Sequence, residues 1–220
     1  MNATPQHTQL LDALAAASSS IRLKAALAAG THPEDGFVDA LVARCAVEPD
    51  FFVRDMLTWA LTRHAAELTV PKLRAELGSG TAQARSQALH TLSKIADPAA
   101  WPSITPSLLR DADDEVARSA WRTAVVLVPD TEKPRLAAEL ATQFGRGDRQ
   151  LRLSLSRALV ALGTVVEPVL EAASTRADPE VRAHARATAE LLRDPDAGFH
   201  LDIDEAKRVA ALGPERAATC

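Results

Sequence analysis

The stretch ITPSLLRDADDEVAR, residues 104–118, contains the features that decide the fold of this chain. Two apolar residues four apart, Ile104 and Leu108, are followed by an aspartate-rich turn at 111–114 and by a second apolar pattern around Arg118. Residues four apart lie on one face of a helix, and aspartate ahead of an apolar run is a common helix start signal. The stretch therefore predicts two helices joined by a short turn.

The same arrangement returns along the chain at intervals of 30 to 34 residues. Each time, an arginine marks the start of the second helix, with apolar or small residues one position before it and three, six and seven positions after it. These offsets fall on one side of a helix, so each second helix is amphipathic. The six arginines are Arg22, Arg54, Arg85, Arg118, Arg152 and Arg182. A helix–turn–helix unit that repeats six times with this period indicates a solenoid.

We place the solenoid at residues 1–195 and expect residues 196–220 to form a tail with a short capping helix at about 203–212. The acidic run at 202–205 would be the first turn of that helix. Prolines in the first helices should bend or shorten them, because proline lacks a backbone donor. These are Pro71, Pro106, Pro134 and Pro168. The approximate units are 7–32, 33–64, 68–96, 98–128, 131–162 and 165–193.

Composition agrees with packed helices and limits the class of function. The chain is rich in alanine, has 4% aromatic residues and contains no Tyr, which argues against a β-sandwich or barrel. Its 25 basic and 29 acidic residues give a formal net charge of −4, and neither half of the chain has a basic excess. We therefore expect no nucleic-acid partner, since such proteins usually display a basic surface.

Two cysteines, Cys45 and Cys220, are too far apart in sequence to indicate a zinc site or a disulfide framework. Cys45 lies on an apolar helical stripe and is expected to be buried, whereas the terminal Cys220 is expected to be an exposed free thiol. No signal-peptide pattern and no apolar run of membrane-spanning length is present. We expect a cytoplasmic protein that has no contact with a membrane.

The stretch at 104–118 resembles the HEAT repeat, and so does VVEPVLEAASTRADPEVRAHA at residues 165–185. The resemblance covers roughly residues 7–193 and is weakest in the first unit, where serines at 18–20 replace the Asp-Pro turn. It implies an all-α protein, a right-handed α-α superhelix of the armadillo/HEAT type with about six helical hairpins. In that family the second helices line the concave face. The resemblance indicates architecture and says little about function.

The repeated arginines, called the arginine ladder here, have two interpretations. They could bind phosphate groups, or they could hold the repeats together, and we favour the structural interpretation. The family resemblance implies that each arginine contacts a turn aspartate of its own or a neighbouring unit. Aspartates stand just upstream of four arginines: Asp50, Asp113 or Asp114, Asp148 and Asp178. These aspartates should also cap the second helices. On this interpretation, loss of Arg118 would leave an aspartate unpaired and cost ~1–3 kcal/mol.

No catalytic or cofactor-binding motif is found in the sequence. The six histidines lack H-x-x-x-H spacing, and no Walker A, G-x-G-x-x-G or G-x-S-x-G sequence occurs. We predict that the protein binds no metal and no cofactor, because no cluster of His, Cys or carboxylates has ligand spacing within a helix.

A candidate binding site follows from helix geometry. Positions one, five and eight residues after each ladder arginine are expected to point away from the core. After Arg54, the first two of these positions are Asp55 and Trp59. The corresponding residues of other units are His90 and Arg157, and Arg122 lies on the flank of the same face. Large aromatics are normally buried, so Trp59 either lines a binding groove or is covered locally. Trp121, on the opposite side of its helix, is predicted to be a core residue.

We expect a monomeric, non-catalytic interaction module that binds a protein or peptide on its concave face. The alternative is an enzyme resembling the HEAT-like alkylpurine DNA glycosylases, which hold a cationic base with Trp and Asp, as Asp55 and Trp59 could do. A lyase-like HEAT protein is a further alternative. The small number of basic residues on the candidate face argues against tracking along DNA.

Overall fold

A computed structural model describes residues 5–194, which form twelve α-helices and no strand. The predicted all-α fold of stacked helical hairpins is confirmed. The predicted helix at 203–212, the acidic run at 202–205 and Cys220 lie outside the described residues. The helices are α1 (Pro5–Leu14), α2 (Ser19–Thr31), α3 (Val38–Val47), α4 (Phe51–Thr62), α5 (Ala66–Glu76), α6 (Ala82–Ile95), α7 (Pro106–Leu109), α8 (Asp114–Leu127), α9 (Lys133–Ala141), α10 (Arg149–Ala161), α11 (Glu167–Ser174) and α12 (Pro179–Arg193).

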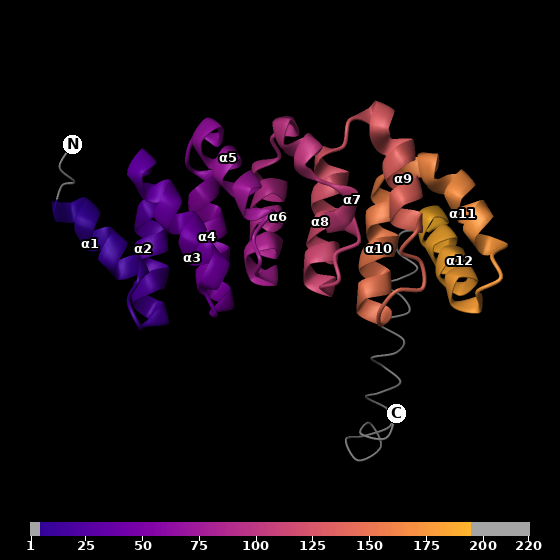
Figure 1. The fold of residues 1–220 in the computed structure, drawn as a ribbon, viewed down its shortest axis with the longest axis horizontal. Helices are drawn as coiled ribbons and strands as arrows, with labels where there is room; N and C mark the ends of the chain where they lie inside the picture. Colours follow the sequence, from indigo (N-terminus) through magenta and orange to yellow (C-terminus); the bar gives the residue numbers. More distant parts are fainter. Residues whose placement is uncertain (1–4, 195–220) are drawn as a thin grey trace, which may run out of the picture. The chain divides into compact units, whose positions relative to one another are not determined.

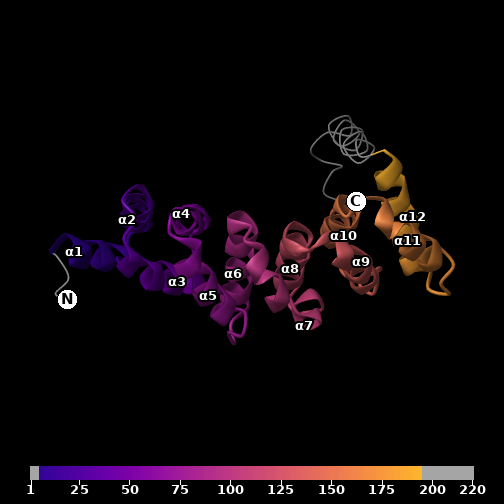
Figure 2. The same cartoon turned by 90° about the horizontal axis from the view of Figure 1, so that it is seen from above.

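The described residues divide into two compact units, with the boundary between Leu136 and Ala137. In the first unit, each odd-numbered helix packs against the even-numbered helix that follows it, from α1 with α2 to α7 with α8 (Figure 1). Within this unit the odd-numbered helices α1 to α7 form one layer and the even-numbered helices α2 to α8 the other (Figure 2). Neighbouring helices of the second layer, α2 and α4, α4 and α6, and α6 and α8, contact one another. In the second unit α12 packs against both α10 and α11.

The core of the first unit lies between the two layers and is built from the predicted offsets. Leu57 and Leu61, three and seven positions after Arg54, are fully buried. Trp121 is also buried, as predicted, and its indole N–H donates to the Leu109 carbonyl at 2.8 Å. That hydrogen bond satisfies the polar atom that would otherwise oppose burial of a tryptophan.

Cys45 is buried on α3, as the sequence predicts. Burial raises the pKa of its thiol to about 12, because an apolar environment disfavours the thiolate. Cys45 is therefore an uncharged packing residue at neutral pH.

Aspartate caps start four of the second helices, α4, α8, α10 and α12. Asp50 accepts from the backbone N–H groups of Phe52 at 2.9 Å and Val53 at 3.1 Å. Asp113, Asp148 and Asp178 cap α8, α10 and α12 by the same kind of contact. The predicted capping role of these four aspartates is confirmed. Each cap satisfies donors that have no partner within the helix.

The first-helix prolines act mainly as helix starters. Pro106, Pro134 and Pro168 lie at the first or second position of α7, α9 and α11, where a missing N–H has no hydrogen bond to lose. Pro71, by contrast, lies inside α5. Among residues 5–194, no helix combines the length and the apolar character needed to cross a bilayer.

Candidate functional site

The arginine ladder is engaged with the backbone of its own repeats. Arg22 donates to the carbonyls of Ala16 at 2.9 Å and Ala17 at 2.7 Å, both in the turn between α1 and α2. Arg54, Arg85, Arg152 and Arg182 donate to carbonyls five to seven residues upstream in the same way. Each of these guanidinium groups therefore ties the start of a second helix to the turn before it. Sequence reasoning did not anticipate carbonyls as the shared partners.

Three ladder arginines also bind a carboxylate of the next hairpin, 26 or 28 residues further along the chain. Arg22 binds Glu48, Arg85 binds Asp111 and Arg152 binds Glu180. Asp111 is a turn aspartate of a neighbouring unit, as the family resemblance implies for such arginines. The other two acceptors are glutamates, one in a turn and one in the first turn of a helix. These contacts link successive hairpins.

Arg118 behaves differently from the other ladder arginines, and the expectation for it was wrong. Its guanidinium pairs with Glu115 on the same helix, three residues earlier, rather than with a turn aspartate. Asp113 uses its carboxylate to cap α8, accepting from the N–H groups of Glu115 and Val116. Loss of Arg118 therefore leaves no capping aspartate unpaired.

Glu48, at the α3–α4 turn, is a buried acidic residue with several partners. Arg22 donates to both of its carboxylate oxygens at 2.6 Å, and Arg44 donates to Oε2 at 2.7 Å. The Asp50 N–H donates to Oε1 at 2.9 Å. Burial by itself would raise the pKa of Glu48, but the hydrogen bonds from Arg22, Asp50 and Arg44 outweigh it and lower the pKa to about 2.

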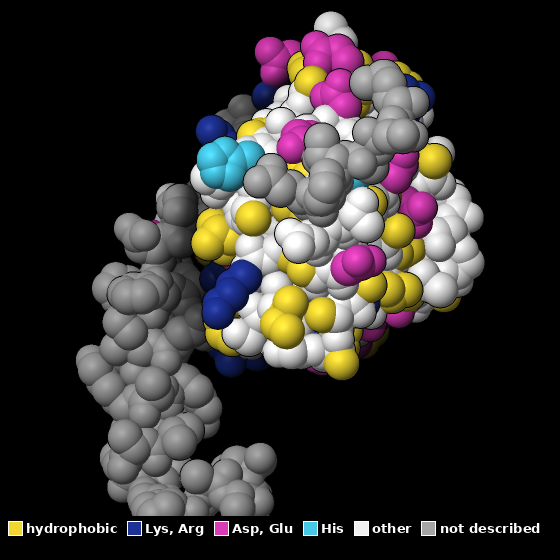
Figure 3. All heavy atoms as spheres, turned by 90° about the vertical axis from the view of Figure 1, so that its left-hand side faces the viewer, with side chains coloured by type: hydrophobic (Ala, Val, Ile, Leu, Met, Phe, Trp, Pro, Cys, Tyr) yellow, Lys and Arg dark blue, Asp and Glu magenta, His cyan; other side chains and the backbone are white. Residues whose placement is uncertain are grey.

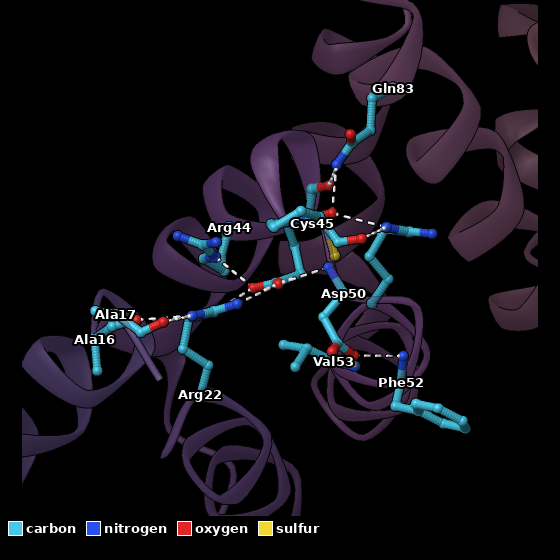
Figure 4. A network of polar contacts seen from close by, with 12 residues as sticks. Ala16, Ala17, Arg22, Arg44, Cys45, Asp50, Phe52, Val53 and Gln83 are labelled. Carbon is cyan, nitrogen blue, oxygen red and sulfur yellow. Dashed lines mark hydrogen bonds and ion pairs between the residues drawn. The ribbon is translucent and has the colours of Figure 1, made fainter. Parts of the chain in front are cut away.

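A third hairpin reaches the same turn. The amide of Gln83 on α6 donates to the carbonyls of Cys45 at 3.2 Å and Glu48 at 2.8 Å. Figure 4 shows Arg22, Arg44 and Gln83 converging on the turn between α3 and α4. This network joins side chains of α2, α3 and α6. The buried charge of Glu48 is therefore explained by its role in holding the hairpins together, without a catalytic role.

The predicted binding residues of the first unit lie on three neighbouring second helices. Asp55 and Trp59 are exposed on α4, His90 is half-buried on α6 and Arg122 is exposed on α8. Burial lowers the pKa of His90, Lys94 and Arg122 lower it further, and Asp55 opposes them. His90 therefore lies within electrostatic reach of both Asp55 and Arg122. Arg157 is exposed on α10, in the second unit.

Trp59 is neither fully exposed nor covered, because 38% of its surface is accessible. Its indole packs on Gly30 of α2, where a Cβ atom would meet Cζ3 of the ring at 2.4 Å and the Ala60 Cα at 2.9 Å. The missing side chain at Gly30 lets α2 and α4 approach at this point. The ring is thus held in place along part of its surface and accessible along the rest.

Two further apolar residues are exposed on the same helices. Leu27 of α2 is 47% exposed and Val126 of α8 is 51% exposed. They lie five and eight positions after Arg22 and Arg118, at the offsets that marked the candidate face, so the sequence already held this signal. We define the second-helix face as Leu27, Asp55, Trp59, His90, Lys94, Arg122 and Val126.

The start of α4 carries another exposed apolar feature that the sequence reasoning did not single out. Phe51 and Phe52 are both exposed and meet edge to face, with ring centroids 5.6 Å apart. In Figure 4 the Phe52 ring points away from the network around the turn. Hydrophobic side chains are also visible among charged ones at the end of the first unit where α1 and α2 lie (Figure 3).

The second unit contains a buried histidine, His184 on α12. The Gly145 N–H donates to its Nδ1 at 3.1 Å, so Nε2 holds the proton and donates to the Arg152 carbonyl at 2.9 Å. Ser156 lies 3.1 Å from Nε2. Burial lowers the pKa of His184, and the charge of Arg152 acts in the same direction, while the bond to the Arg152 carbonyl opposes them. His184 is therefore a neutral, structural histidine.

Within the described residues 5–194, no group of three or more His, Cys, Asp or Glu side chains is arranged to hold a metal ion. The structure thus offers two polar centres, around Glu48 and His184, whose groups are saturated by protein partners. The second-helix face is one surface of the described residues on which charged, aromatic and aliphatic groups are presented together to solvent.

No family model matches the chain, and no curated protein sequence is significantly similar to it. Among solved structures, the complex of CpcE and CpcF of phycocyanin lyase from Nostoc sp. PCC7120 is similar at 19% identity, covering 87% of this chain and 78% of that chain with a TM-score of 0.48. Two engineered proteins are similar at 20% and 16% identity. Both matches cover 84% of this chain, and 95% and 97% of the engineered chains, with TM-scores of 0.47. Membership of the HEAT family stays a prediction.

Proposed function

We propose that this chain is a helical-repeat interaction module and that a polypeptide partner binds across the second-helix face of its first unit. The observation that supports this proposal most is the accessible surface of Trp59. A tryptophan that leaves 38% of its surface in water does so against the usual tendency of large aromatics to be buried.

The surroundings of Trp59 are those of a protein-binding hot spot. Leu27 lies on the preceding second helix and is more exposed than Trp59, while Asp55 is one helical turn away. Interface centres combine an aromatic anchor with aliphatic surface, and polar groups around them exclude water and set orientation. The second-helix face has each of these components.

The mechanism of binding follows from the packing of the ring. Because Trp59 rests on Gly30, its side chain is already ordered before a partner arrives, which lowers the entropic cost of association. A polypeptide that crosses α2, α4, α6 and α8 in that order would meet Leu27 and the exposed part of the Trp59 ring first and then the charged groups of α6 and α8.

The arginine ladder is not part of this proposal. Its guanidinium groups are directed to the carbonyls and carboxylates that hold the hairpins together. A ladder of phosphate-binding arginines would require those groups to leave their partners. The binding groups therefore have to come from the second-helix face itself.

Selection of random dodecapeptides on the immobilised full-length protein tests the proposal. We expect peptides that bind the wild type and the Leu68→Ala variant but not the Trp59→Ala variant. Leu68 is a matched control, since it is 37% exposed and lies on α5 in the other layer. If the selected peptides bind all three proteins equally, or none is selected, the proposal is wrong.

A further inference from the structure

The second helices of the first unit differ in charge from the chain as a whole, whose formal net charge is −4. Neither α2 nor α6 contains an acidic residue. Beyond the first turn of α8, the exposed charged residues of the four second helices are Lys24, Asp55, Lys94 and Arg122. Outside the first turn of α8, the exposed part of these helices therefore carries three cations and one carboxylate, although the chain as a whole is acidic.

The acidic residues in the first turn of α8 do not alter this balance at the centre of the face. Asp114 and Glu115 lie at the end of the helix next to the interhelical turn, and Glu115 pairs with Arg118. Arg122 and Val126 lie one and two turns further along α8 than Arg118. The cationic part of the face is thus formed by α6 and α8.

The pKa of His90 depends on the charges of the second-helix face, because His90 lies on α6 between α4 and α8. Besides burial, the cations of Lys94 and Arg122 lower the pKa of His90, and only Asp55 among its charged neighbours raises it. The local potential at His90 is therefore positive in sum. A neutral His90 also leaves the site able to accept or donate hydrogen bonds at physiological pH.

The two cations of the second-helix face lie at its α6–α8 end, where Val126 is also exposed, and its other apolar members lie on α2 and α4. Leu27 and Trp59 stand on α2 and α4, and Lys94 and Arg122 stand on α6 and α8. A ligand that spans the face would bury an apolar group at one end and meet positive charge at the other. The arrangement of these groups therefore predicts the orientation of the ligand on the face as well as the types of residue that it contains.

We infer that the partner segment is an acidic polypeptide with a bulky apolar residue that seats against Leu27 and Trp59 and with carboxylates over α6 and α8. The inference rests on the proposed function and specifies its partner. Packed helices lie about 8–10 Å apart. An extended chain advances about 3.3 Å per residue, so carboxylates about three and about six residues from the apolar residue would lie over α6 and α8.

A nucleic acid fits the same face less well. Its backbone carries a negative charge at every residue and requires a longer series of cations than the face offers. Asp55 stands one turn from Trp59, where a base stacked on the ring would bring its phosphate close. A polypeptide can place its carboxylates at α6 and α8 and avoid Asp55.

The dodecapeptide selection distinguishes this inference from the proposed function. We expect the Trp59-dependent peptides to share a bulky apolar residue with Asp or Glu three and six positions from it. Trp59-dependent peptides without that acidic pattern would overturn the inference and leave the proposed function standing. Absence of any Trp59-dependent peptide would overturn both.

Charge reversal gives the second arm of the test. For a selected peptide, the Lys94→Glu/Arg122→Glu double variant should weaken binding by about tenfold or more, and Asp55→Lys should strengthen it. Affinity should also fall as NaCl rises from about 50 to about 500 mM, because exposed charges are screened. All these side chains are exposed, so the variants should fold. An unchanged affinity, or displacement of the peptide by equimolar single-stranded or duplex DNA, would overturn the inference.

Discussion

The guanidinium of Arg22 and the carboxylate of Glu48 form a two-pronged ion pair between the first and second hairpins, with both nitrogen–oxygen distances at 2.6 Å. Glu48 is fully buried and Arg22 nearly so. Arg44 approaches the same carboxylate from α3. Removing one member of a buried charged group is costly because it leaves the remaining charges without compensation.

Glu48→Gln should therefore destabilise the protein strongly at neutral pH, by about 3–5 kcal/mol in free energy of unfolding. Urea unfolding followed by circular dichroism measures this quantity. Glu115→Gln is the matched control, because Glu115 pairs with Arg118 on the exposed surface of α8 and its loss should cost less than about 1 kcal/mol. Equal costs for the two variants would contradict the role of the network.

The same network predicts the response to acid. The folded-state pKa of Glu48, about 2, lies below its ordinary value of 4.5, so its contribution is fully present above pH 4.5 and is lost as pH falls towards 2. The difference in stability between wild type and Glu48→Gln should shrink over this interval. A difference that stays constant from pH 5 to pH 2 would show that Glu48 is not held ionised by its partners.

Two ladder arginines that occupy equivalent sequence positions should differ in importance. Arg85→Ala removes hydrogen bonds to Asp111 and to the Ser79 carbonyl, and we expect a loss of about 2–3 kcal/mol. Arg118→Ala removes one pair with Glu115 and should cost less than about 1 kcal/mol. Denaturant unfolding of both variants decides the matter. Comparable losses of unfolding free energy in the two variants would show that the ladder arginines have the same structural importance, as the sequence predicted.

The contact between Gly30 and Trp59 predicts an unusual helix substitution. Alanine favours helices more than glycine does, yet Gly30→Ala should destabilise the first unit by about 1–3 kcal/mol, because its Cβ would overlap the indole ring. In the Gly30→Ala/Trp59→Ala double variant, part of this loss should be recovered. Thermal unfolding of the two single variants and the double variant measures the coupling. Strictly additive losses would show that the ring does not rest on Gly30.

The architecture was predictable because the same pattern of apolar offsets recurs along the chain and four of the second helices begin with a capping aspartate. Leu57, Leu61 and Trp121 fall at the apolar offsets, and Asp50, Asp113, Asp148 and Asp178 stand where a helix needs a cap. The spacing of apolar residues within a helix and the residue that caps the helix both depend on residues close together in the chain, so they can be recognised in a single sequence.

What the sequence did not reveal depends on contacts between residues far apart in the chain. Glu48 looks like an ordinary turn residue, and its burial follows only from the approach of Arg22, Arg44 and Gln83. Arg118 shares its position in the repeat with Arg85 but has a different partner. The packing of part of the Trp59 ring depends on Gly30, whose significance appears only when α2 lies against α4.

The affinity of a selected acidic peptide for the Trp59→Ala and Leu68→Ala variants, measured by calorimetric titration at one pH and salt concentration, tests the central claim most directly. Part of the Trp59 ring is packed, so each variant must first be shown to be folded at the temperature of the titration. Trp59→Ala should raise Kd by about thirtyfold, which corresponds to about 2 kcal/mol, and Leu68→Ala should leave Kd within about twofold. Equal Kd values for wild type, Trp59→Ala and Leu68→Ala would contradict the assignment of the second-helix face as the binding surface.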